Sequence, residues 1–152
     1  MIQFTGLELS PGKAAYLKYL VFQGGTVKIS GIAGYFEVDP STVTRTIHDL
    51  TEEGYVEHQP YGGVALTRFG REYGAFLVRR HRILGLVLSH YGLSEDEACR
   101  EASRMESYLS RDAVNKMCRS LGHPTEGFCG EICHDPLCLS RTVTNDLHEN
   151  VS

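Results

Sequence analysis

The sequence predicts a mainly α-helical protein with one small β-hairpin, and three observations support this fold class. Apolar residues recur at helical spacing in several segments, most of which begin with a capping residue. Only two short segments, at 55–58 and 64–66, alternate in the way that strands do. The chain has 152 residues, which suits one compact domain or two small ones that share a core.

Three helices are predicted in the first third of the chain. Ser10 and Pro11 supply an N-cap and an N1 proline for a helix that ends at the glycine pair 24–25. A short helix follows in GIAGYFEV, with Ser30 as its expected cap. After a break at Asp-Pro-Ser, the third helix is expected over 41–53. This order gives a helix, a tight turn and a new helix.

The third helix and the hairpin after it complete a recognisable unit. Val43, Ile47 and Leu50 lie on one face at i, i+4 and i+7, which leaves the polar residues on the other faces. Gly54 is expected to close the helix in a left-handed conformation. Two strands around Pro60 then form the hairpin. Helix, turn, helix and hairpin in this order predict a winged helix-turn-helix.

The second half of the chain is predicted to be helical. Thr67 is expected to cap a helix of about two dozen residues, which is longer than one small domain needs and so links two regions. One amphipathic helix is expected from Ser94, where the pattern of a capping box begins, to about Leu109. A second is expected from Ser110 to Leu121. Amphipathic helices of this kind suit a dimer interface. We therefore expect a winged-helix domain over 1–72, a helical dimerisation domain over 73–140 and a tail over 141–152 that is a short helix or disordered.

Composition and charge restrict the functional class. No apolar run reaches the roughly 18 residues that a membrane span needs, and the first residues lack the pattern of a secretory leader, so a cytoplasmic protein is expected. The formal charge of −4 argues against a protein that coats nucleic acid indiscriminately. The charge is compatible with a sequence-specific DNA-binding protein, which needs only a local basic surface. An enzyme is not expected, because the sequence has neither a glycine-rich nucleotide loop nor a Cys-x-x-Cys pair.

The winged helix predicts an interface for a double-stranded DNA operator. Arg45 is the main candidate for base contact, because its guanidinium fork matches guanine O6 and N7 in the major groove. Other residues in reach of phosphates, bases or the minor groove are Lys28, His58 and Tyr61, together with Ser41, Thr42, Thr44 and Thr46. Two alternatives stay open. These side chains could be ordinary solvated surface, or the winged helix could be a protein-interaction module with a structural zinc site.

All five cysteines lie beyond residue 98, which predicts a metal or redox site in the C-terminal third. The principal candidates are Cys118, Cys129, Cys133 and Cys138. Four thiolates satisfy a zinc ion or an iron-sulfur cluster, and the wide spacing with a nearby proline favours the cluster over Zn²⁺ or Fe²⁺. Cys99 and His134 are secondary candidates, and Cys99 and Cys118 could instead be buried helix residues. Loss or oxidation of the cluster would shift the spacing of two recognition helices in a homodimer.

Several segments together resemble the diphtheria toxin repressor and manganese transport regulator family. They are AAYLKYLVFQGG, DPSTVTRTIHDLTEEGYVEH, LTRFGREYGAFLVRRHRIL and the stretch from Glu106 to Ser110, so the resemblance covers roughly residues 10 to 130. It implies a metal-responsive repressor that binds its operator as a homodimer, with an N-terminal winged helix and a C-terminal helical dimerisation domain. Such a protein would be a transcription regulator.

The residues at the family's metal-ligand positions are mostly changed. The first-helix ligands fall on Ala15 and Lys18, and the later motif reads Ser103, Glu106 and Ser107. His81 matches a family ligand, but the carboxylate expected four residues later is Gly85. A lone histidine beside three arginines is more often a surface residue, so His81 and Glu106 are minor candidates. We therefore expect that the family's divalent site has been abandoned or rebuilt, and that the cysteine loop replaces it.

Overall fold

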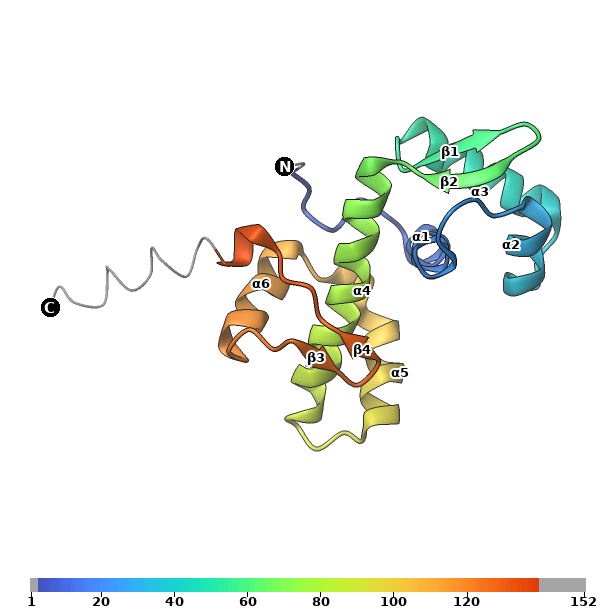
Figure 1. Ribbon diagram of the computed structural model, residues 1–152. Coiled ribbons are helices and arrows are strands. Elements are labelled where there is room, and N and C mark those ends of the chain that lie inside the picture. Colours follow the sequence, from blue (N-terminus) through green and yellow to red (C-terminus); the bar gives the residue numbers. More distant parts are fainter. Residues whose placement is uncertain (1–2, 140–152) are drawn as a thin grey trace, which may run out of the picture. The chain divides into compact units, whose positions relative to one another are not determined.

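The computed structural model describes residues 3–139, which divide into two compact units (Figure 1). The first unit comprises residues 9–77 together with Gln3, and the second comprises residues 4–8 and the chain from Val78 onward. The division falls inside a helix, five residues beyond the expected boundary at 72. The predicted fold class, mainly α-helical with a small hairpin, is confirmed.

The first unit contains the predicted winged-helix elements in order. They are α1 (Pro11–Gln23), α2 (Ile29–Phe36), α3 (Pro40–Glu52), β1 (Val56–Gln59), β2 (Gly63–Leu66) and the first part of α4 (Arg68–Ser89). The Ser10 hydroxyl accepts a hydrogen bond from the Lys13 N–H and caps α1, as predicted. Asp39 caps α3 through the Ser41 N–H. The expected cap at Ser30 is wrong, because α2 begins two residues earlier, at Ile29, and its N-cap is Lys28, whose side chain makes no capping bond.

The core of the first unit fixes the orientation of α3. Val43, Ile47 and Leu50 are buried, so the opposite face of this helix is left to solvent. The two strands pair antiparallel, with Val56 opposite Leu66. Val27 extends this sheet by bonding Val64. The wing is therefore held by the same core that presents α3.

The second unit is a set of helices followed by a small hairpin. It contains the rest of α4, α5 (Glu95–Met105), the short 3-10 helix η1 (Glu106–Tyr108), α6 (Arg111–Ser120), β3 (Glu126–Gly127) and β4 (Gly130–Glu131). The capping box of Ser94 and Glu97 is present at α5. The helix predicted to run to Leu109 ends instead at Met105 and tightens into η1. None of the helices within residues 3–139 is long and apolar enough to span a bilayer.

Residues 121–139, which include the predicted cysteine loop, contain regular structure. They contain the β3–β4 hairpin and a helical turn over 136–139. A buried polar network holds them in place. Asp135 accepts two hydrogen bonds from the Arg111 guanidinium, at 2.8 and 3.1 Å, and one from the Asn115 amide at 3.2 Å. Arg79 completes the network by donating to Asn115. The predicted tail over 141–152 lies outside the described residues.

Candidate nucleic-acid interface and metal sites

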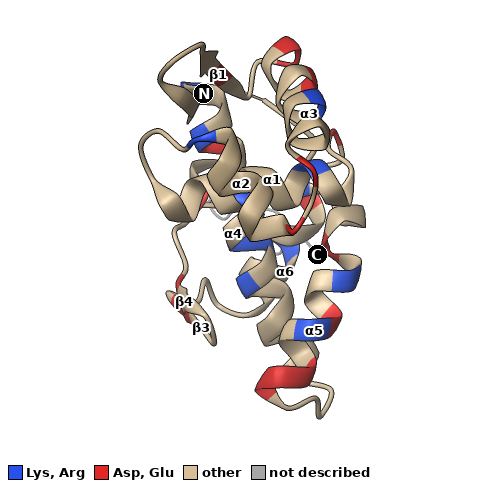
Figure 2. Ribbon diagram, turned by 90° about the vertical axis from the view of Figure 1, so that its right-hand side faces the viewer, with Lys and Arg blue, Asp and Glu red and all other residues tan. Residues whose placement is uncertain are grey.

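The solvent face of α3 carries most of the residues predicted to contact DNA. Ser41, Thr42, Thr44 and Arg45 are exposed and Thr46 is half-buried. Arg45 has no hydrogen bond or ion pair with any described residue, so its guanidinium is available to a ligand. Acidic residues occur toward the end of the same helix (Figure 2). The face is therefore polar with one cation rather than broadly basic.

Three of the α3 hydroxyl groups predicted to contact DNA are already engaged in local hydrogen bonds. Thr44 donates to the Pro40 carbonyl at 3.0 Å and Thr46 to the Thr42 carbonyl at 3.1 Å. The Ser41 hydroxyl donates to the Asp39 carboxylate at 2.6 Å, and these bonds lower the pKa of Asp39. These three hydroxyls can accept a hydrogen bond but must give up a bond to donate one, which leaves the Arg45 guanidinium and the exposed Thr42 hydroxyl as the available donors.

The remaining predicted DNA-contacting residues lie outside α3. Tyr61 is fully exposed at the tip of the β1–β2 hairpin, and His58 is exposed on β1. Lys28 is exposed at the start of α2. Their positions at a wing tip and a helix start suit contacts with a nucleic-acid backbone.

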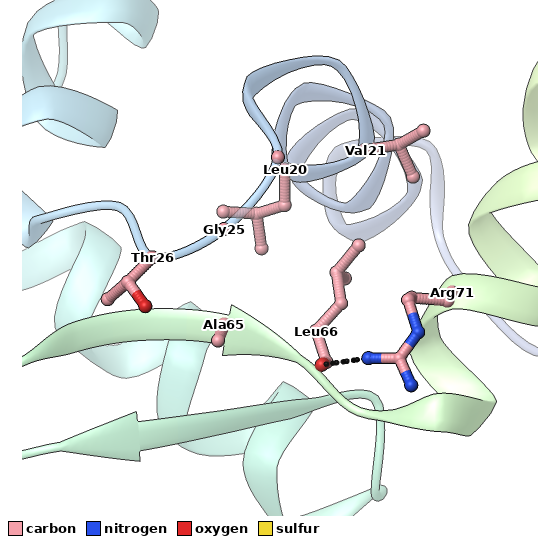
Figure 3. Close-up of a pocket in the computed structure, with 8 residues that line it drawn as sticks. Leu20, Val21, Gly25, Thr26, Ala65, Leu66 and Arg71 are labelled. Carbon is pink, nitrogen blue, oxygen red and sulfur yellow. Dashed lines mark hydrogen bonds between the residues drawn. The ribbon is translucent and has the colours of Figure 1, made fainter.

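A hollow of about 370 Å³ lies in the first unit beside the end of α1 and β2 (Figure 3). Its walls are largely apolar, and Arg71 donates a hydrogen bond to the Leu66 carbonyl at 3.2 Å across one side. No cysteine, histidine, aspartate or glutamate lines it. This hollow therefore offers no metal ligands.

Four of the five cysteines fall into two groups in the second unit, and the four predicted ligands do not form one group. Cys99 and Cys129 lie with His81, and we call these three residues the α4–α5 cluster. Cys118 and Cys138 lie with His123, and we call these three the α6 cluster. Within each cluster all ligand atoms lie within 4.8 Å of one another. Cys133 is exposed and belongs to neither cluster.

The α4–α5 cluster brings a histidine and two thiols from three elements to one point. His81 Nε2 lies 3.2 Å from the Cys99 Sγ and 3.9 Å from the Cys129 Sγ, and the two sulfurs are 3.8 Å apart. His81 is on α4, Cys99 is on α5 and Cys129 lies in the turn between β3 and β4. The expectation that His81 is a surface residue is wrong, because its side chain is only 13% exposed.

Glu106 orients the histidine of this cluster. Its Oε2 lies 2.6 Å from His81 Nδ1, and its side chain is 10% exposed. With Nδ1 engaged in this way, Nε2 is the nitrogen that faces the thiols. A carboxylate that binds the far nitrogen of a metal-ligating histidine is a common arrangement around protein metal sites. Glu106 is therefore placed to position His81 rather than to contact an ion itself.

The β3–β4 hairpin carries Cys129 close to α4. Arg82 on α4 donates hydrogen bonds to the carbonyl oxygens of Glu131 and Cys129. Gly130 has φ of +140°, and a Cβ there would lie 2.8 Å from the Arg82 guanidinium. A Cβ at Gly85, the family's missing carboxylate position, would meet the Phe128 ring at 3.9 Å. The hairpin thus lies over the position where the family has a carboxylate, and it supplies a thiol nearby.

The α6 cluster is more deeply buried. The Cys118 and Cys138 side chains are inaccessible to solvent, and each sulfur lies 3.6 Å from His123 Nδ1. Burial raises the pKa of the Cys138 thiol, and the neighbouring Cys118 raises it further. Burial would also raise the pKa of Asp135 nearby, but hydrogen bonds from Arg111 and the Leu137 N–H outweigh it and lower that pKa. The carboxylate is therefore charged at neutral pH.

Both clusters fit a tetrahedral metal ion of the size of zinc. Zn–S bonds of about 2.3 Å and Zn–N bonds of about 2.0 Å place two sulfurs about 3.8 Å apart, and a sulfur and a nitrogen about 3.5 Å apart. The α4–α5 cluster has 3.8 Å between its sulfurs, and 3.2 and 3.9 Å from sulfur to nitrogen. The α6 cluster has 3.6 Å for both sulfur–nitrogen pairs.

Three of these six residues are not among the principal candidates of the sequence. His81 and Cys99 are minor candidates, and His123 is not among the candidates. Glu106, behind the histidine, is also a minor candidate. His81 and Glu106 stand at family ligand positions, so their retention together is the signal that could have found the site. Ala15 and Lys18 lie on α1 in the first unit and offer no ordinary ligand, whereas Ser103 donates its hydroxyl to the Cys99 carbonyl.

Taken together, a winged helix-turn-helix unit and a helical unit with metal-ligand clusters define a metal-binding transcription regulator. Residues 10–64 match the N-terminal DNA-binding domain of iron-dependent repressors, and residues 67–133 match their metal binding and dimerisation domain. The chain belongs to this family, the diphtheria toxin repressor and manganese transport regulator family that the sequence resembled. Its relatives are transcription regulators, not enzymes, as predicted.

Individual relatives agree with this assignment. The chain is 34% identical over 98 residues to the HTH-type transcriptional regulator MntR of Geobacillus kaustophilus, a match that covers 64% of this chain and 70% of that protein. It is similar to the structure of the hypothetical protein SSo2273 from Sulfolobus solfataricus, with a TM-score of 0.73, 27% identity, and coverage of 83% of this chain and 100% of that one. It is also similar to the structure of ScaR with bound Zn²⁺, with a TM-score of 0.67, 26% identity, and coverage of 82% and 63%.

Proposed function

We propose that this protein is a homodimeric, metal-responsive repressor that binds operator DNA through α3 and senses a divalent metal ion at the α4–α5 cluster. The observation that carries the proposal is the convergence of His81, Cys99 and Cys129 at tetrahedral spacing, with Glu106 behind the histidine. Three protein ligands leave a fourth position open, which suits an ion that exchanges with its surroundings. Cys129 is exposed, so the ion can reach the cluster from solvent.

The donor set determines which metals the cluster prefers. Thiolates and imidazole favour zinc or ferrous iron over manganese, which prefers oxygen ligands. ScaR, a structural neighbour described as a manganese-activated repressor, was solved with Zn²⁺ and with Cd²⁺, so the preference proposed here depends on the donor set of this chain. An iron-sulfur cluster receives less support, because such clusters are usually held by four thiolates and only two thiols converge at each site here. We therefore propose Zn²⁺ or Fe²⁺ for the α4–α5 cluster; acid-labile sulfide in the purified protein would contradict this choice and favour an iron-sulfur cluster.

An ion at this cluster would act by joining three elements. It would connect α4, α5 and the β3–β4 hairpin, which otherwise meet through hydrogen bonds such as those from Arg82. Fixing these elements stiffens the dimerisation unit, so that less conformational entropy is lost when two recognition helices bind one operator. The metal-bound form should therefore bind DNA more tightly than the metal-free form.

The experiment selects a binding site from random double-stranded DNA in the presence of Zn²⁺, then measures affinity for that site with and without metal. We expect the affinity of the wild-type dimer to rise at least tenfold with Zn²⁺ or Fe²⁺. Cys99→Ser should remove this response, whereas Cys133→Ser, which changes an exposed thiol outside both clusters, should keep it. An unchanged response in Cys99→Ser would overturn the sensor assignment. Failure to select any DNA site would favour the protein-interaction alternative.

A further inference from the structure

The α6 cluster is a second set of metal-ligand atoms, separate from the proposed sensor. Cys118 lies in the last turns of α6, Cys138 lies in the helical turn 136–139, and His123 lies in the connection that follows α6. The two thiols are inaccessible to solvent, while the sensor's Cys129 is exposed. Cys138 also lies beyond residue 133, where the family's C-terminal domain match ends. This cluster is thus built in part from a segment outside the shared domain.

The backbone is shaped to bring His123 back to the thiols. His123 has φ of +54°, a left-handed conformation that a residue other than glycine seldom adopts. Its N–H donates to the Cys118 carbonyl at 2.9 Å, so the chain folds back over the end of α6. Strained conformations of this kind are often kept where a side chain has a specific task. Here the result is that Nδ1 stands 3.6 Å from both sulfurs.

A second histidine lies beside the cluster, outside the set of ligand atoms that are all within 4.8 Å of one another. The His134 ring centroid is 5.8 Å from that of His123, and the rings are nearly perpendicular. His134 Nδ1 is buried and makes no hydrogen bond to the described residues. A buried nitrogen without a partner is costly, and an ion beside it would remove that cost. A shift of the His134 ring toward the cluster would complete a set of two thiols and two imidazoles, which is a common set for structural zinc.

We propose that Cys118, His123 and Cys138, with His134 as the fourth ligand, bind a structural Zn²⁺ ion that fixes the segment 123–138 to α6. The ion acts together with the bonds of Asp135 to Arg111 and Asn115, which hold the same segment. Because a closed, buried site exchanges its ion slowly, it would stay occupied while the sensor fills and empties. This site does not depend on the proposed function.

The first test is the zinc content of protein purified under anaerobic, reducing conditions. We expect two Zn²⁺ per chain, of which one is removed quickly by a chelator and one slowly. His123→Gln, a change at a half-buried side chain, should lose the slowly released ion and keep the metal response of DNA binding. Cys99→Ser should show the opposite pattern. An unchanged slow ion in His123→Gln would overturn the site, and a persistent response in Cys99→Ser would overturn the sensor alone.

Two further measurements separate loss of the zinc site from misfolding of a variant and from a disulfide between the two thiols. Cys118→Ser and Cys138→Ser change buried atoms and could fail to fold, so His134→Gln serves as a milder variant. It should lower zinc affinity at least tenfold while zinc still binds at saturation; unchanged affinity would remove His134 from the ligand set. A wild-type mass lower by two hydrogens, with no slowly released zinc, would identify a Cys118–Cys138 disulfide and overturn the proposal.

Discussion

Replacing Glu106 by glutamine should weaken metal binding at the α4–α5 cluster without abolishing it. The variant keeps the size of the side chain but removes the charge that faces His81 Nδ1 at 2.6 Å. Hydrogen bonds to charged groups contribute about 1.5 to 3 kcal/mol. This range corresponds to a loss of about 10- to 100-fold in metal affinity, which is also the usual effect of changing such an outer residue. We therefore expect a loss within that range for Glu106→Gln.

The assay is competition for Zn²⁺ against a chromophoric chelator, with Co²⁺ absorption to report thiolate coordination. Glu101→Gln is the matched control, because Glu101 lies on α5 with a side chain 44% exposed and pairs only with Arg104 among the described residues. That control should bind Zn²⁺ as the wild type does. Affinity within twofold of wild type in Glu106→Gln would refute the positioning role. A loss above about a thousandfold with an altered Co²⁺ spectrum would make Glu106 a direct ligand.

Four other predictions test the DNA interface, the hairpin and the buried network. Arg45→Ala should weaken operator binding by about 1 to 3 kcal/mol and relax base preference at one position, measured by fluorescence anisotropy on matched and mismatched sites; unchanged preference would contradict it. Lys28→Ala should weaken DNA binding by the same factor on all DNA sequences. It should also reduce the slope of log affinity against log salt concentration by about one for each subunit. Gly130→Ala should lower metal affinity at the α4–α5 cluster, because a residue with a side chain rarely adopts φ of +140° and the turn that carries Cys129 would have to shift, whereas Gly12→Ala, in α1 with open space around its Cβ, should not. The pKa of Asp135 is lowered in the folded protein, so its charged carboxylate adds to the free energy of unfolding at pH values above the ordinary pKa of 3.8. This contribution is lost as pH falls through the lower pKa of the folded state. Urea unfolding at a series of acidic pH values should show this loss of stability in the wild type and not in Asp135→Asn.

The elements that follow local rules were predictable from the sequence. Ser10 with Pro11, and Ser94 with Glu97, cap helices through contacts within four residues, and the apolar spacing at 43, 47 and 50 marks the buried face of α3. These signals need no knowledge of the tertiary fold. The order of helices and hairpin then defined the winged helix.

The grouping of the cysteines was not predictable, because it depends on long-range packing. Cys129 and Cys138 are near in sequence, yet Arg82 holds one at α4 while Asp135 and its partners hold the other at α6. Each therefore meets a partner more than fifteen residues away, Cys99 or Cys118. Sequence spacing favours one four-thiolate site, and the packing of the hairpin divides it in two.

The first residues of the chain have a consequence for the helical unit. Residues 4–8 belong to the second unit, where Arg80 donates to the Gly6 carbonyl and the Arg111 N–H donates to the Thr5 carbonyl. These residues precede the winged helix in the sequence, yet their hydrogen bonds are made within the helical unit. Removal of the first eight residues would take away one of the two carbonyl groups to which Arg80 donates, and also the acceptor of the Arg111 N–H. An N-terminal truncation should therefore destabilise the helical unit, although the residues removed stand next to the DNA-binding elements in the sequence.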